Sequence, residues 1–294
     1  MNIIELLKAS QDDLFKMLEK LEGISSKAEG SFIIWDKEPK KNKPMVCVHL
    51  DTINTHAEQT QLEFIENSNN IACGNKQMSC LGGDDRAGVW IALELIEYMN
   101  RTTEYKYSVG FFCDEEIGCV GSGNYMTLND KFDENVTAFI GLDRRSPKGK
   151  QEVALYGYDN YELTQMFIEH GYKEAFGSVT DASALSQYCD IACINLSCGY
   201  DNEHTHREVL YVECMVDTLN CLKQLPYLGE KFHYDSSYNT SIFGNSYRDY
   251  KSIQENTPVV CDWCASHTYL YYVEGELLCA DCIKDLEGLY YDED

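Results

Sequence analysis

Residues 45–52 read Met-Val-Cys-Val-His-Leu-Asp-Thr, an apolar run of strand length that ends in a histidine and an acid two residues apart. Because side chains alternate along extended backbone, His49 and Asp51 point to the same side of this predicted strand. His49 can then ligate a metal ion while Asp51 accepts the other ring N–H, which fixes the tautomer. A structural or solvent-facing histidine is the alternative for this segment taken alone.

The segments on either side of this strand predict the fold class. Further apolar runs of strand length occur at 32–35, 109–113, 138–142 and 191–196, and two shorter runs suggest a hairpin at 62–65 and 71–73. Helical periodicity occurs over residues 3–22, 86–99, 161–170, 182–188 and 212–225. Strands that alternate with helices predict an α/β fold, here a three-layer α/β/α domain with a mostly parallel central sheet.

The composition disfavours several classes of protein. The 294 residues include 24 basic and 49 acidic ones, which gives a formal net charge of −25. This excess of acid argues against nucleic-acid binding, because phosphate neutralisation needs clustered Lys and Arg. No apolar run approaches the roughly 18–20 residues of a membrane span. We expect a cytoplasmic protein, since the N-terminus shows no leader pattern and most cysteines are scattered through apolar runs, as free thiols are.

Four further segments place metal-capable side chains at or after a predicted strand, or before a helix, where ligands gather in open α/β sheets. They are Leu81–Gly88 with paired Asp residues, Asp114–Gly118 with three consecutive carboxylates, Asp143, and Asp201–Val209 with two of the seven histidines. Taken singly, the paired Asp residues also suit an ordinary helix N-cap, and the three carboxylates suit a solvated turn. Together the segments supply His, Asp, Glu-Glu, Asp and His, a donor set that suits zinc, or manganese or cobalt.

In combination these motifs resemble the co-catalytic di-zinc exopeptidase clan, which contains peptidase T, the aminoacylases, carboxypeptidase G-type enzymes and related bacterial aminopeptidases. The resemblance covers residues 45–210 and rests on His-Leu-Asp-Thr at 49–52, Gly-Gly-Asp-Asp-Arg-Ala-Gly at 82–88 and Asp-Glu-Glu-Ile-Gly at 114–118. It implies an active site with two zinc ions, or manganese or cobalt, that activate a water for hydrolysis of an amide bond.

The resemblance further implies which residues bind the two ions. Asp84 would be the bridging carboxylate, because the clan's bridging Asp stands two residues before a basic residue, here Arg86. The other ligands would be His49 and Asp143 on one ion, and Glu116 and His204 on the second ion.

The remaining roles follow from the same resemblance. Glu115 would be the general base, and Asp51 would act in catalysis through His49. His204 is the preferred last ligand, because the clan's last histidine stands four residues before a glutamate, here Glu208; His206 is the competing assignment. Residues 177–182 also resemble a segment that shapes the substrate site.

The spacing departs from the relatives in two places. His49 to Asp84 is 35 positions and Asp143 to His204 is 61, too few for the insertion or the lid domain that relatives carry there. The resemblance therefore implies a catalytic domain without a lid. Its substrate would be a peptide or an N-acyl amino acid, and we favour an aminopeptidase because acidic surroundings attract a free α-ammonium group. The alternatives are a deacylase or carboxypeptidase, or a catalytically inactive relative that serves as a binding module.

The C-terminal segment contains a second metal motif, CxxC-x14-CxxC, whose cysteines are Cys261, Cys264, Cys279 and Cys282. Two facing CxxC clamps form a closed tetrahedral thiolate site, so we expect one structural zinc in a zinc ribbon, with a hairpin at 268–273 and 276–278. The predicted organisation is a catalytic domain at 1–228, a linker or arm at 229–257 and the ribbon at 258–294. Acidic residues around the ribbon disfavour DNA and favour either a protein partner or simple packing of the ribbon against the enzyme.

Overall fold

The computed structural model describes residues 2–67, 69–74, 79–177 and 179–234, together with 270–273 and 276–279. The chain divides into two compact units, Met1–Tyr238 and Asn239–Asp294. Within the described residues, the first unit contains one sheet of eight strands and one of four, and the second unit contains a two-stranded hairpin. No described helix has both the length and the hydropathy to cross a membrane.

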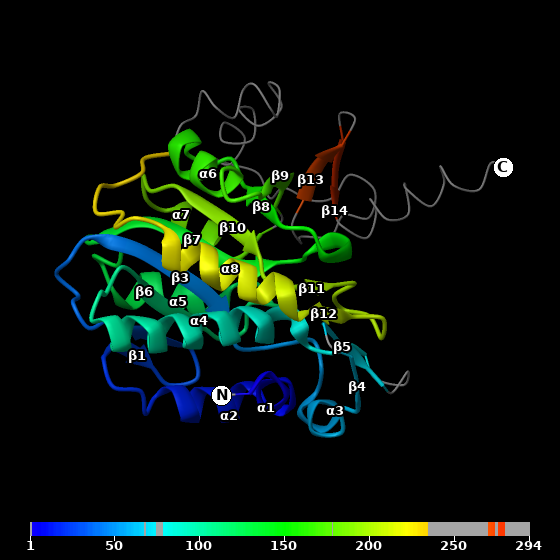
Figure 1. The fold of residues 1–294 in the computed structure, drawn as a ribbon. Coiled ribbons are helices and arrows are strands. Elements are labelled where there is room, and N and C mark those ends of the chain that lie inside the picture. The colour runs from blue at the N-terminus through cyan, green and yellow to red at the C-terminus, as the bar shows by residue number, and fades with distance from the viewer. Residues whose placement is uncertain are drawn as a thin grey trace. The chain divides into compact units, whose positions relative to one another are not determined.

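The eight-stranded sheet forms the centre of the first unit (Figure 1). Its strands run in the order β1-β2-β6-β3-β7-β10-β8-β9. The four central strands are parallel to one another, and antiparallel pairing joins them to the strands on either side. The bounds are β1 (Ile24–Ala28), β2 (Phe32–Trp35), β3 (Lys43–His49), β6 (Ser108–Phe112), β7 (Val136–Arg144), β8 (Glu152–Leu155), β9 (Lys173–Phe176) and β10 (Cys193–Ser197).

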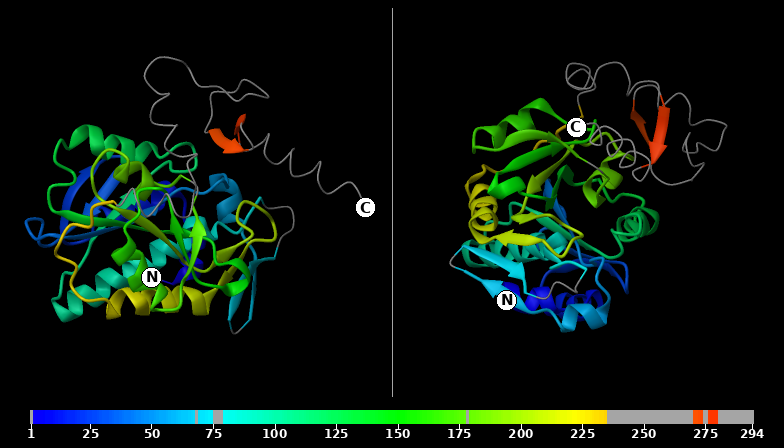
Figure 2. Two further views of the ribbon diagram at one scale, coloured as in Figure 1. Left: turned by 90° about the horizontal axis from the view of Figure 1, so that it is seen from above. Right: turned by 90° about the vertical axis from the view of Figure 1, so that its right-hand side faces the viewer.

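The sequence of the central strands explains their position. Every residue of β3 and β6 is buried, and a continuous apolar run is what a parallel strand requires when helices cover both faces of its sheet. Helices α1 (Ile3–Lys8), α4 (Gly83–Thr102) and α8 (Val212–Gln224) pack together on one face, while α5 (Val120–Leu128) and α7 (Asp181–Ser186) pack on the other. Figure 2 shows this layering from two further directions. The predicted three-layer α/β/α fold is confirmed.

The bounds of the helices of the first unit are α1 (Ile3–Lys8), α2 (Gln11–Leu18), α3 (His56–Thr60), α4 (Gly83–Thr102), α5 (Val120–Leu128), α6 (Tyr161–Ile168), α7 (Asp181–Ser186) and α8 (Val212–Gln224). Four of these helices, α4, α6, α7 and α8, agree with the predicted ranges, whereas α3 and α5 were not predicted and the N-terminal prediction differs from the structure. The prediction of one helix over 3–22 is wrong, because Ser10 begins a new helix there. Its side chain accepts the backbone N–H of Asp13 while the Asp13 carboxylate accepts that of Ser10, a reciprocal capping box.

The second sheet lies beside one end of the first and has the order β11-β12-β5-β4. The predicted hairpin forms β4 (Phe64–Glu66) and β5 (Asn70–Cys73). It is extended by β11 (Tyr200–Asp201) and β12 (Val209–Tyr211), which the sequence pattern did not predict. The loop between β11 and β12 carries the two histidines of the segment at 201–209, so this sheet places that loop near the other metal-capable segments.

The second unit is described only as β13 (Leu270–Val273) and β14 (Glu276–Cys279), which pair antiparallel and confirm the predicted hairpin. Cys261, Cys264 and Cys282 lie outside the described residues, so the zinc ribbon stays a prediction. At the other end of the predicted linker, Phe232 still hydrogen-bonds through its backbone with Ala192 and Thr137 of the first unit.

Candidate metal centre

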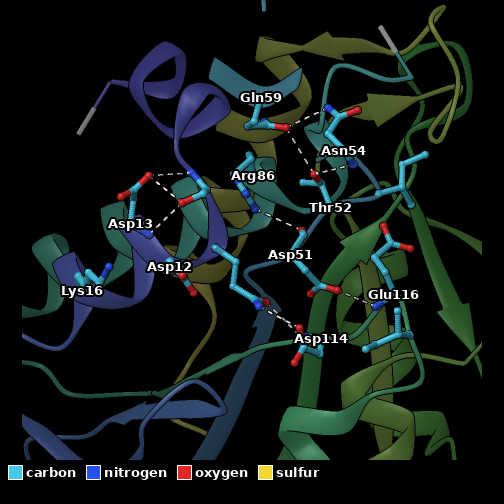
Figure 3. Close-up of a pocket in the computed structure, with 14 residues that line it drawn as sticks. Asp12, Asp13, Lys16, Asp51, Thr52, Asn54, Gln59, Arg86, Asp114 and Glu116 are labelled. Carbon is cyan, nitrogen blue, oxygen red and sulfur yellow. Dashed lines mark hydrogen bonds between the residues drawn. The ribbon is translucent and has the colours of Figure 1, made fainter. Parts of the chain in front are cut away.

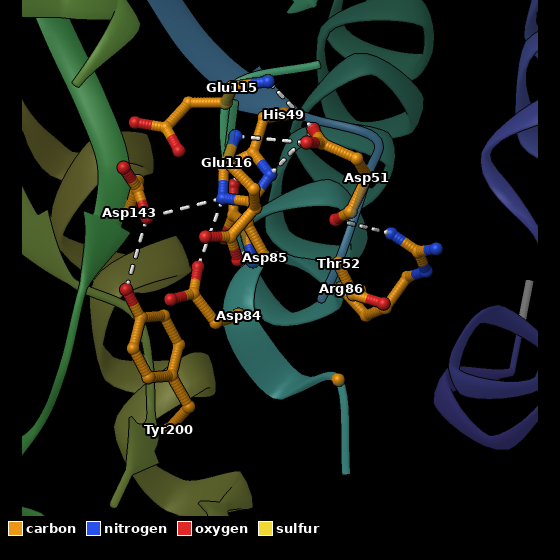
Figure 4. A network of polar contacts seen from close by, with 12 residues as sticks. His49, Asp51, Thr52, Asp84, Asp85, Arg86, Glu115, Glu116, Asp143 and Tyr200 are labelled. Carbon is orange, nitrogen blue, oxygen red and sulfur yellow. Dashed lines mark hydrogen bonds and ion pairs between the residues drawn. The ribbon is translucent and has the colours of Figure 1, made fainter. Parts of the chain in front are cut away.

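The metal-capable side chains converge at one end of the central sheet (Figure 4). Parallel pairing aligns the ends of β3, β6 and β7: His49 lies opposite Phe112, and Cys47 lies opposite Gly141. The carboxyl ends of these strands therefore deliver His49, the turn that holds Glu115 and Glu116, and Asp143 to one place.

The carboxylate of Asp84 lies between two imidazole rings. Its Oδ1 is 3.0 Å from His49 Nε2, and its Oδ2 is 3.3 Å from His204 Nε2. Each ring has one further carboxylate partner: Asp143 Oδ1 is 3.5 Å from His49 Nε2, and Glu116 Oε1 is 2.8 Å from His204 Nε2. Two donor sets thus share Asp84, each with one imidazole and one other carboxylate. Imidazole and carboxylate donors in this number fit zinc.

Two groups of three metal-capable side chains lie close together among the described residues, and both contain His49. The ligand atoms of His49, Asp84 and Glu116 lie within 4.8 Å of one another, and so do those of His49, Asp85 and Asp143. Asp85 was not assigned a role from the sequence. Its carboxylate accepts the backbone N–H groups of His49 at 3.2 Å and Gly88 at 2.9 Å, so we interpret it as a support for the start of α4 rather than as a ligand.

The electrostatics of the centre favour positive charge. Hydrogen bonds with Asp84 and Glu116 raise the pKa of His204 to about 11. Burial alone would lower the pKa of His49, but hydrogen bonds with Asp143, Asp51 and Asp84 raise it well above its usual range. For Asp84, burial alone would raise the pKa of the carboxyl, but hydrogen bonds with His204 and His49 lower it below its usual range. The same arrangement would stabilise metal cations.

The pKa values of Glu115 and Asp143 are raised, in contrast to that of Asp84. Burial raises the pKa of Glu115 to about 9. Burial, together with the Asp84 carboxylate, raises the pKa of Asp143 to about 6. Burial thus favours the protonated form of the Glu115 carboxyl, and a nearby cation would favour its ionised form.

Asp51 connects the first histidine to the paired glutamates. Its Oδ1 is 3.2 Å from His49 Nδ1. The same carboxylate accepts the backbone N–H of Glu115 at 3.0 Å and that of Glu116 at 2.9 Å. Asp51 thus orients the His49 ring and fixes the turn that carries both glutamates, which is how a residue behind the ligands positions them.

Three residues that sequence reasoning missed, or used only for spacing, support the ligands. Glu208 is fully buried and accepts the backbone N–H groups of Gly82 at 2.8 Å and Asp84 at 3.0 Å. The Asn195 side chain accepts a hydrogen bond from the Asp143 backbone N–H and donates one to the Asp143 carbonyl. The Tyr200 hydroxyl donates to Asp143 Oδ1 at 3.0 Å.

The glycines of the segment at 82–88 are required by close packing. A Cβ on Gly88 would lie 2.1 Å from the backbone oxygen of Leu142, and one on Gly83 would lie 2.9 Å from a Glu208 carboxylate oxygen. Only glycine lets the start of α4 approach β7 and Glu208 this closely.

The remaining sequence-predicted residues lie as follows. His206 is exposed, and among the described contacts it is His204 that reaches Asp84 and Glu116. In the segment at 177–182, Val179 lines the cavity of the centre, and Asp181 is buried with its carboxylate bonded to the Ser122 hydroxyl at 2.6 Å.

Two cavities border the centre. A small one of about 230 Å³ is lined by Asp84, Glu115, Glu116 and His204 and by residues of β7 and β10. A larger one of about 700 Å³ is lined by α2, by residues 51–54 and by the turn after β6 (Figure 3). Glu116 lines both. In the wall of the larger cavity the buried Arg86 donates to the Leu50 carbonyl at 2.6 Å, which fixes the chain just after His49.

The profile of peptidase family M28 matches residues 33–191, which is more than half of the chain. No curated protein matches the chain in sequence. Among solved structures, the chain is similar to a tripeptidase from Staphylococcus aureus, with a TM-score of 0.56, 11% identity, and coverage of 75% of this chain and 94% of that chain. It is also similar to the aminopeptidase PepT from Bacillus cereus, with a TM-score of 0.54, 13% identity, and coverage of 75% and 95%. An aminopeptidase from the archaeon Desulfurococcus kamchatkensis has a TM-score of 0.56 and 14% identity, with coverage of 82% and 96%. Identities this low show a shared fold.

Proposed function

The chain belongs to peptidase family M28, and we propose that it is a two-zinc aminopeptidase. Membership confirms the resemblance to the zinc exopeptidase clan that the motifs predicted. The observation that carries the two-metal proposal is the position of Asp84, whose two oxygens face His49 and His204 separately. One carboxylate shared by two imidazole-containing donor sets is the arrangement that a pair of cations needs.

The ligand sets that we propose are His49, Asp84 and Asp143 for one ion, and His204, Asp84 and Glu116 for the other. When bound, two divalent ions supply a water of lowered pKa and polarise the scissile carbonyl.

Glu115 is the proposed general base. Its carboxylate lines the small cavity, and its side-chain contact among the described residues is the Cys119 thiol at 3.7 Å. By contrast, the Glu116 carboxylate lies 2.8 Å from the His204 ring. Glu115 is therefore free to accept a proton from the attacking water and to return it to the leaving nitrogen. Asp51 holds Glu115 in position through its backbone N–H.

The cavities support cleavage at a chain end. The cavity of about 230 Å³ beside Glu115 has room for a single residue, and the larger cavity of about 700 Å³ on the other side of Glu116 can receive the rest of a peptide. We favour removal of the N-terminal residue, because the acidic lining around the centre attracts an α-ammonium group. Release of a C-terminal residue or of an N-acyl group is the alternative.

Zinc stoichiometry and turnover test the proposal together. We expect three zinc ions per chain by elemental analysis, two at the centre and one at the proposed four-cysteine site of the ribbon. Asp84→Ala should retain one ion, and the double change Cys261→Ser with Cys264→Ser should retain two. Wild-type protein should hydrolyse aminoacyl anilides and peptides with a free N-terminus in preference to N-acyl amino acids.

Other results would select a different function. Retention of all zinc by Asp84→Ala would refute the bridging role. Preference for N-acyl amino acids would make the protein a deacylase. Two zinc ions at the centre without turnover of any substrate would favour an inactive binding module. A protein partner recruited by the ribbon remains a separate proposal, tested by comparing complexes of the full chain with those of residues 1–228.

A further inference from the structure

The small catalytic cavity contains two arginines that the proposed chemistry does not use. Arg144 and Arg145 directly follow the ligand Asp143 and line the same cavity of about 230 Å³. Basic side chains are scarce in this chain, with 24 against 49 acidic ones. Two adjacent arginines beside a cluster of carboxylates therefore need an explanation.

Arg144 is explained by the fold. Its Nε and Nη2 lie 3.1 Å and 2.7 Å from Glu152 Oε2, and its side chain is 17% exposed. Glu152 belongs to β8 of the central sheet. This short ion pair satisfies the Arg144 guanidinium inside the protein and leaves little of it for a ligand.

Arg145 is different. Its Nη1 lies 3.5 Å from Glu203 Oε1, and its side chain is 49% exposed. This is longer than an ordinary N–H···O bond of about 2.7–3.2 Å, and it is the one polar contact of the Arg145 guanidinium among the described residues. The other Glu203 oxygen is buried without a hydrogen-bond partner in the described part of the chain. The pair is loose, so most guanidinium N–H groups remain available to a ligand.

The backbone places this guanidinium at the metal centre. Arg145 directly follows Arg144, the last residue of β7, and it lines the same cavity as Asp143. The Ser197 hydroxyl donates to the Arg145 carbonyl at 2.6 Å, and the Cys198 backbone N–H donates to the Arg144 carbonyl at 2.9 Å. β10 thus fixes the backbone from which Arg145 reaches the cavity.

We propose that Arg145 recognises a carboxylate group of the substrate, which makes it a specificity-determining residue. A planar guanidinium forms paired, charge-assisted hydrogen bonds with a carboxylate, and a neutral amide of the same shape cannot match them. The substrate class is a short peptide with a carboxylate within reach of the centre. That group is either the side chain of an acidic N-terminal residue or the free C-terminus of a dipeptide. The inference rests on the proposed peptidase function for its kinetic test.

Matched substrate pairs test the proposal and separate the two sources. Glutamyl anilide against glutaminyl anilide reports a side-chain carboxylate, and leucylglycine against leucylglycinamide reports a terminal carboxylate. In the pair that reports the true source, Arg145→Gln should lower kcat/KM for the substrate with the carboxylate by about tenfold or more. The kcat/KM of its neutral counterpart should change less than about threefold. Arg145→Lys should recover part of the loss, because charge remains while the planar fork is gone.

A matched control replaces a different arginine, Arg101, by glutamine and so makes the same change in charge. Arg101 lies at the exposed end of α4, with its side chain 64% exposed, so Arg101→Gln should leave the ratio within each pair unchanged. Equal loss for both members of each pair in Arg145→Gln, or no loss at all, would overturn the proposal.

Calorimetric titration gives a readout that does not depend on turnover. Glutamate and glycine should bind the zinc-loaded full chain more tightly than glutamine and glycinamide in at least one of these pairs, and Arg145→Gln should abolish that difference. If this holds while no substrate is hydrolysed, the carboxylate site stands and the peptidase proposal falls. If substrates are hydrolysed without any dependence on Arg145, the peptidase proposal stands and the carboxylate site falls. Equal binding of acid and amide in both pairs would also reject the site.

Discussion

The two adjacent glutamates on the turn after β6 face different partners, and this difference separates their roles. Glu116 contacts the His204 ring at 2.8 Å, whereas Glu115 lies against the Cys119 thiol at 3.7 Å. Asp51 accepts the backbone N–H groups of both. Because the turn is held through its backbone, a change in the Glu115 side chain alters proton transfer without disturbing the ligands.

We therefore expect Glu115→Gln to lower kcat by about 10²–10⁴, the usual contribution of a general base, while elemental analysis finds unchanged zinc content. Glu116→Gln is the matched comparison: it removes a ligand oxygen from the same turn and should lower zinc content. Turnover of Glu115→Gln within a few-fold of wild type would assign the base to another group.

At this scale the sequence predicts residues that occur in short motifs at strand ends, but not those whose position depends on strand register. Asn195 is a polar residue in the predicted strand at 191–196, which is a signal that it has a specific partner. Register places it opposite Gly141, where a Cβ would come within 2.8 Å of the Asn195 amide oxygen. Tyr200 gave no signal, because its contact with Asp143 exists only once both sheets have formed.

The start of helix α4 depends on a residue far away in the chain. Glu208 accepts the N–H groups of Gly82 and Asp84, although 126 positions separate it from Gly82. These are orphan donors at a helix start, and the buried carboxylate satisfies them. The backbone that carries Asp84 is thus fixed from the loop that also carries His204.

Glu208→Gln should therefore weaken zinc binding at the centre by about 10–100-fold, the usual cost of losing a group that positions ligands. The reason is that the glutamine NH2 group replaces one of the two Glu208 carboxylate oxygens, so one backbone N–H, of Gly82 or of Asp84, loses its acceptor. Competition with a chromophoric chelator measures the affinity. Glu97→Gln on α4, whose side chain is 59% exposed, should leave the affinity unchanged. Wild-type affinity in Glu208→Gln would show that the start of α4 holds Asp84 without this contact.

Helices and strands were predictable from the sequence where burial requires mostly apolar residues. Central strands such as β3 and β6 are buried throughout and mostly apolar, and they were identified, as was α8. The edge strands β1 and β9 were not. β1 reads Ile-Ser-Ser-Lys-Ala with alternating exposure, and β9 reads Lys-Glu-Ala-Phe and is mostly exposed. A strand at the edge of a sheet has fewer neighbours, so its sequence carries a weaker hydrophobic pattern.

Over the whole molecule, the centre joins segments that are far apart in the chain. His49 and His204 are 155 positions apart (204 − 49), and both contact Asp84. The sequence predicted this convergence through the order of its motifs. It did not predict the second sheet that brings the His204 loop into place. Carboxylates that repel one another are gathered here, so without metal the native fold bears an electrostatic cost that bound cations remove.

Removal of metal should consequently destabilise the first unit as a whole. An ion that binds only the folded state adds about 2.7 kcal/mol at 100 times its Kd. Two filled sites would then raise the Tm by roughly 10–20 °C for a domain of this size. Thermal unfolding with and without a chelator measures the difference. Asp84→Asn is the control, because its residual response to chelator reports metal bound elsewhere in the chain, including the C-terminal thiolates. Equal responses in wild type and Asp84→Asn would mean that metal binding and folding are not coupled at this centre.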